Sequence, residues 1–137
     1  MSDQTSTPQR ARPLSPHIQI YRWTLPMMLS ILHRATGVAL YAGTILLAWW
    51  LLAAATGPEA YAQVQAVSSA WYGRLVLFGY SWALLHHMFG GLRHFIWDTG
   101  RGFDLAHVEL IARVTAIAPI ILTVLVWVLA YAYMGAF

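Results

Sequence analysis

Three long stretches of this chain carry no charged side chain, and they limit its fold more than any other feature. They contain 24 residues between Arg34 and Glu59, 18 between Arg74 and Arg93, and 24 after Arg113. A membrane-spanning helix needs roughly 20 predominantly apolar residues, and continuous rather than alternating apolar runs disfavour strands. The chain is therefore expected to be an all-α integral membrane protein, with three transmembrane helices bundled in the lipid bilayer.

The expected organisation is an N-terminal segment, residues 1–25, followed by one transmembrane domain, residues 26–137. The first part of the N-terminal segment is polar. From Arg12 to Pro26 it combines prolines with aromatic residues, which is typical of a segment at the lipid–water boundary. A loop is expected from Thr56 to about Ser69, because Gly-Pro-Glu signals a turn there. The helices are expected to span about residues 26–55, 71–97 and 105–133.

The cationic residues predict the orientation of the chain in the membrane. All eight are arginines, and only Arg74 falls on the far side of the predicted topology. The other seven lie on one side and are Arg10, Arg12, Arg22, Arg34, Arg93, Arg101 and Arg113. By the positive-inside rule the N-terminus is expected inside and the C-terminus outside. The arginines that make the pI basic, about 9.6, are thus explained by membrane topology, and no nucleic-acid partner is expected.

The sequence contains no cysteine. Disulfides, thiolate metal sites, iron–sulfur ligation and covalent c-type haem attachment are therefore excluded for this chain. Histidines are found in the apolar runs themselves, and imidazoles in such positions suggest a metal or haem ligand. Ionisable residues are expensive in a bilayer, so those inside spans are candidate functional residues.

The second apolar run ends in a histidine-rich segment. His87 and His94 are seven residues apart and share one face of a helix. The deeper His87 is a candidate axial ligand for haem iron, and the shallower His94 and Arg93 are candidate donors to haem propionates. His86 is rotated by about 100°, so both neighbours cannot easily serve one iron. The alternative is that these histidines hydrogen-bond across helices without a metal.

A second cluster opens the first span. Ser30 and Arg34 are spaced i, i+4 and face the same way, with His33 on an adjoining part of that surface. A hydroxyl beside a fixed cation could hold a quinone carbonyl and stabilise its reduced anionic forms, while His33 could join the propionate donors. The alternative is that Arg34 only anchors the helix end in the membrane interface.

Two ordered motifs resemble a known family. The first consists of RPLSPHIQIY at residues 12–21 and SILHRATG at residues 30–37, and the second is the His-x3-Gly-Leu-Arg-His-x3-Asp pattern from His87 to Asp98. Both resemble the large cytochrome b membrane-anchor subunit of succinate dehydrogenase, respiratory complex II. The first motif is most similar to the mitochondrial and alphaproteobacterial branch. Because no presequence rich in arginine and free of acidic residues is seen, a bacterial chain is expected.

The resemblance implies specific roles. It makes His87 the axial ligand of a haem b, places His33, His94 and Arg34 near the haem propionates, and makes Ser30 and Arg34 part of a ubiquinone site. It also implies three partners: a flavoprotein subunit, an iron–sulfur subunit, and a second, smaller membrane anchor that completes the bundle and supplies the other haem ligand.

The expected function follows from these roles. The chain would pass electrons from the iron–sulfur subunit to ubiquinone as a subunit of the enzyme, without taking part in succinate chemistry, because it carries no flavin or dicarboxylate motif. It would lie in the bacterial inner membrane, or in the mitochondrial inner membrane if eukaryotic. Two alternatives stay open: a fumarate reductase anchor, and a non-redox three-span assembly or transport protein.

Overall fold

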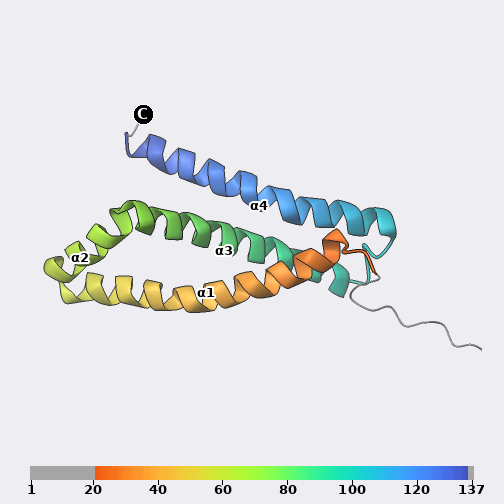
Figure 1. Ribbon diagram of the computed structural model, residues 1–137, viewed down its shortest axis with the longest axis horizontal. Helices are drawn as coiled ribbons and strands as arrows, with labels where there is room; N and C mark the ends of the chain where they lie inside the picture. Colours follow the sequence, from red (N-terminus) through yellow and green to blue (C-terminus); the bar gives the residue numbers. More distant parts are fainter. Residues whose placement is uncertain (1–20, 136–137) are drawn as a thin grey trace, which may run out of the picture.

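The structure is a computed structural model that describes residues 21–135, and within that range the chain forms four helices (Figure 1). They are α1 (Leu25–Thr56), α2 (Pro58–Ser69), α3 (Trp71–Asp98) and α4 (Leu105–Tyr133). The three long helices run side by side, and the short α2 joins α1 to α3 at one end (Figure 1). Each long helix contacts the other two, so they form a single bundle.

The three long helices confirm the prediction of three membrane spans. All three are long and apolar enough to cross a membrane, and their bounds differ by at most one residue from the expected ones. Few of their side chains are buried within the chain; Val38 and Ile45, for example, are each 71% exposed. So much exposed apolar surface requires lipid or another protein around the bundle.

The prediction of a loop between the first two spans is wrong, because this segment folds into α2. Gly57, with φ of 141°, makes the turn, and Pro58 begins a new helix with Glu59 in its first turn. Proline at the helix start and an acidic residue near the positive end of the helix dipole both favour helix there. Val64 on α2 is buried, so α2 packs onto the end of the bundle.

The start of α1, the end of α3 and the start of α4 meet at the other end of the bundle (Figure 1). Gly100 and Gly102 adopt positive φ in the α3–α4 turn. Asp104 then caps α4 by accepting from the His107 backbone N–H, and the His107 ring donates to it at 2.7 Å. This side-chain hydrogen bond holds the pKa of Asp104 below its usual value, so the charged cap persists to lower pH than an unpaired aspartate would allow.

This end of the bundle, the arginine end, carries five of the seven arginines expected inside. They are Arg22, Arg34, Arg93, Arg101 and Arg113. The remaining two, Arg10 and Arg12, and most of the expected interfacial segment lie outside the described residues. The arginines of the described chain are thus grouped as the positive-inside rule requires.

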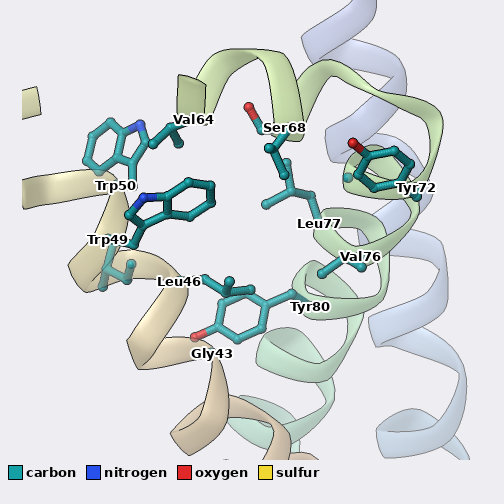
Figure 2. Close-up of a pocket in the computed structure, with 13 residues that line it drawn as sticks. Gly43, Leu46, Trp49, Trp50, Val64, Ser68, Tyr72, Val76, Leu77 and Tyr80 are labelled. Atoms are coloured by element: carbon teal, nitrogen blue, oxygen red, sulfur yellow. The ribbon is translucent and has the colours of Figure 1, made fainter. Parts of the chain in front are cut away.

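An apolar pocket of about 440 Å³ lies at the opposite end, between α1, α2 and α3 (Figure 2). Trp49 and Trp50 from α1, Val64 from α2, and Tyr72 and Tyr80 from α3 contribute to its wall. Its lining contains no histidine and no charged side chain. The candidate chemistry of the chain therefore lies at the arginine end rather than in this pocket.

Candidate haem and quinone site

His33 of α1 and His87 of α3 form the centre of the site. Their rings stack with centroids 4.1 Å apart and planes only 8° from parallel. Each ring also bonds to the backbone of the other residue: His33 Nε2 lies 3.2 Å from the His87 carbonyl oxygen, and His87 Nδ1 lies 3.1 Å from the His33 carbonyl oxygen. These two hydrogen bonds hold α1 against α3 at the level of His87, the candidate ligand.

The pairing determines which nitrogen of each ring carries hydrogen. A carbonyl oxygen can only accept, so His87 Nδ1 and His33 Nε2 must both be the protonated donors. Within residues 21–135, the His87 ring forms its hydrogen bond through Nδ1 and none through Nε2. A metal-ligating histidine commonly donates its other ring N–H to a carbonyl in this way, which orients the ring and increases its basicity.

Two glycines make room for the paired rings. A Cβ on Gly37 would come within 3.0 Å of His87 Cε1, and a Cβ on Gly90 would overlap the His33 ring. A Cβ on the neighbouring Gly91 would meet nothing within 4 Å among the described residues, so it is Gly90 that accommodates the imidazole. The role of Gly37 was not predicted, because it depends on the rotation of α1 against α3.

His94 extends the pair to a histidine cluster, which we define as His33, His87 and His94. The ring centroids of His94 and His33 are 5.6 Å apart, so His87 and His94 do share a side of α3, as their spacing predicts. Within the described residues, no three histidine or acidic side chains are arranged to hold a metal ion by themselves. The cluster is suited to a group that needs one axial nitrogen and nearby polar donors.

His86 lies on a different face of α3 from the cluster. It is only 1% exposed, and its ring is tilted against Trp82. Arg93 is also buried, 2% exposed, with its guanidinium 5.1 Å from the Trp97 ring centroid. Neither His86 nor the Arg93 Nε and Nη1 atoms have a hydrogen-bond partner within residues 21–135. His86 is thus enclosed by the chain's own bundle, whereas the His87 ring is only half-buried.

Ser30 and Arg34 contact each other on α1, as the i, i+4 spacing predicts. Arg34 Nε donates to the Ser30 carbonyl at 3.2 Å, and Arg34 Nη2 donates to Ser30 Oγ at 3.3 Å. Because the Ser30 hydroxyl accepts from the guanidinium, its own hydrogen is available to another acceptor. Arg34 is exposed on the surface of the chain, so a molecule outside the bundle can reach both groups.

The glycine that accommodates His33 gives a testable stability difference. Gly90→Ala should push the His33 ring out of its position and destabilise the assembled protein by about 1–3 kcal/mol, the usual cost of overpacking. Thermal unfolding of the purified complex measures this effect. The matched control is Gly79→Ala on the same helix, where a Cβ meets nothing within 4 Å. It should be neutral or slightly stabilising, and equal losses in both variants would contradict the assigned packing.

Comparison with known proteins identifies the class. Residues 8–130 match the family described as "Succinate dehydrogenase/Fumarate reductase transmembrane subunit". The chain therefore belongs to this family of membrane subunits, and it is a multi-pass inner-membrane protein.

Within this family, the individual relatives are cytochrome b subunits of succinate dehydrogenase. The chain is 39% identical over 122 residues to the succinate dehydrogenase cytochrome b556 subunit of Paracoccus denitrificans, covering 89% of this chain and 94% of that one. It is 39% identical over 117 residues to the cytochrome b556 subunit of Rickettsia prowazekii, covering 85% and 91%. It is also 40% identical over 118 residues to the mitochondrial cytochrome b560 subunit of Sus scrofa, covering 83% and 66%. The alphaproteobacterial and mitochondrial resemblance is confirmed.

Proposed function

We propose that this chain is the haem b-binding membrane anchor of a succinate:ubiquinone oxidoreductase and forms part of its quinone-reducing site. The observation that carries the proposal is the His87 ring, whose Nδ1 is bonded to the His33 carbonyl, so that its Nε2 would be available to iron. The names of the relatives, succinate dehydrogenase cytochrome b subunits, support the same function.

The residues around His87 suit a haem b. His87 would supply the axial nitrogen, and His33, His94 and Arg34 would donate to the propionates. His33 uses Nε2 for the His87 carbonyl, so a bond to a propionate would need a hydrogen on Nδ1. When bound, the haem supplies a one-electron redox couple. The chain's own contribution is to orient one imidazole and to place cationic and hydrogen-bonding groups beside it.

A second histidine ligand would come from outside the described chain. His33 and His87 are stacked face to face, so their lone pairs cannot converge on opposite sides of one iron. His86 is enclosed in the core on another face. A haem with two histidine ligands would therefore be shared with a second, smaller membrane anchor, which would also cover part of the exposed apolar surface.

The quinone site would be built on Ser30 and Arg34. The guanidinium fixes the serine oxygen, and the serine hydrogen would donate to a quinone carbonyl oxygen. The positive charge would stabilise the anionic reduced forms of the quinone. Both residues lie near the start of α1 at the arginine end, where an iron–sulfur subunit docked on the inner face would deliver electrons.

The soluble partners follow from what this chain lacks. Succinate oxidation would require a flavoprotein subunit. Electron delivery would require an iron–sulfur subunit, because the sequence has no cysteine to hold a cluster. The family includes fumarate reductase anchors. The relatives cited above are named for succinate dehydrogenase, which supports the succinate-oxidising direction.

Purification of the native complex through an affinity tag on this chain tests the function as a whole. We expect the flavoprotein, iron–sulfur and second anchor subunits to copurify and the complex to reduce ubiquinone with succinate. Recovery of this chain with neither soluble subunit would contradict the proposal.

A further inference from the structure

The His33 carbonyl oxygen lies where three hydrogen-bond donors meet. His87 Nδ1 is 3.1 Å away, and the Thr36 hydroxyl oxygen is 2.9 Å away. In a regular α-helix the same carbonyl also accepts from the N–H four residues on, which here belongs to Gly37. A carbonyl oxygen has two lone pairs, so these donors compete for it.

Thr36 has a choice of acceptor that the other two donors lack. Its hydroxyl lies 3.0 Å from the Leu32 carbonyl as well as 2.9 Å from that of His33, and its single hydrogen is shared between them. The side chain is only 3% exposed, so solvent does not offer it another partner. Gly37 lets the His87 ring approach this carbonyl, because a Cβ there would stand 3.0 Å from His87 Cε1.

We propose that Thr36 is a positioning residue that acts on His87 through the His33 carbonyl. By donating to that oxygen, the hydroxyl weakens its acceptance of the His87 Nδ1 hydrogen and so limits the negative character of the imidazole. The inference rests on the proposed role of His87 as the haem ligand. It assigns to this chain a device that adjusts the redox potential of the haem.

The direction of the effect follows from the competition. Without the hydroxyl, the His33 carbonyl accepts more strongly from His87 Nδ1, and the imidazole becomes a stronger donor through Nε2. A stronger donor favours ferric over ferrous iron. Thr36→Val keeps the side-chain shape and removes the hydroxyl. It should shift the ferric-to-ferrous ratio at a fixed potential by about two- to tenfold towards ferric, and the tenfold limit is about 59 mV for a one-electron couple.

The experiment is a potentiometric titration of the haem in the purified complex, with the g values of the ferric electron paramagnetic resonance signal as a second readout. Thr36→Val and Thr36→Ala should both lower the midpoint potential, and Thr36→Ser, which keeps a hydroxyl, should restore it. The matched control is Thr115→Val on α4, where an equally buried hydroxyl bonds only to the Ile111 carbonyl. This control should leave the potential unchanged.

The outcomes separate this inference from the proposed function. Unchanged potential and g values in Thr36→Val and Thr36→Ala, in a complex whose haem is lost on His87→Ala, would overturn the role of Thr36 and leave His87 as the ligand. An equal shift in the Thr115→Val control would also overturn it, because the effect would then not depend on the His33 carbonyl. A haem that survives His87→Ala with unchanged ligation would remove the proposed ligand itself.

Discussion

Replacing His87 with alanine is expected to abolish the b-type haem absorbance of the purified complex or to convert the haem to a different ligation state. The variant removes the only ring in the histidine cluster whose Nδ1 is bonded to a carbonyl, an arrangement typical of metal-ligating histidines. The measurement is the reduced-minus-oxidised optical spectrum, together with the haem content per complex. Because the variant removes the proposed axial ligand rather than weakening it, the effect should be near complete.

The neighbouring residue provides the control. His86→Leu fills a buried position whose two ring nitrogens have no partner within the described chain, so haem content and ligation should stay essentially unchanged. An apolar replacement at such a position can be neutral for stability. If the two outcomes were exchanged, His86 would be the ligand and the assignment of His87 would be wrong.

Replacing Arg34 or Ser30 with alanine is expected to depress succinate–ubiquinone reductase activity by roughly ten- to a hundredfold. The estimate corresponds to the loss of a charge-assisted hydrogen bond worth about 1.5–3 kcal/mol. Electron transfer from succinate to an artificial acceptor at the soluble subunits should be nearly unchanged, since neither residue touches that chemistry. The two activities are measured side by side on the same purified complex.

Charge loss alone must be separated from loss of the quinone contact. Arg113→Ala removes an exposed arginine from the same end of the bundle, where it pairs with Glu109, and it should preserve both activities. Arg34→Lys keeps the charge that sets topology but loses the planar guanidinium that holds Ser30 Oγ, so it should remain impaired with ubiquinone. Equal loss of both activities in an assembled Arg34→Ala complex would contradict the quinone contact and leave Arg34 only the role of anchoring the helix end in the membrane interface.

The spans could be predicted from sequence because burial in lipid depends on the composition of long stretches. Each expected span agrees with its helix to within one residue at either end. The prediction that failed concerns α2, which was expected to be a loop because Gly57-Pro58-Glu59 signals a turn. Gly57 does break the chain between α1 and α2, but Pro58 and Glu59 begin a helix rather than a loop. A helix of 12 residues is too short for a membrane span, and its packing onto α1 and α3 leaves little trace in composition.

For the site, only the relations between residues of the same helix could be predicted from the sequence. Spacing places Ser30 beside Arg34 and His94 on the side of His87, and both relations hold in the structure. The stacking of His33 on His87 depends on how α1 is rotated against α3, which no periodicity within one helix determines. The role of Gly37 depends on the same rotation.

The most direct test of the central claim is the optical spectrum of the complex purified through this chain, recorded before and after chemical reduction. We predict one b-type haem for each copy of this chain, with histidine as both axial ligands. We also predict that chemical reduction converts the spectrum to that of a reduced b-type haem. A complex that contains the flavoprotein and iron–sulfur subunits and reduces ubiquinone, but carries no haem, would contradict the account.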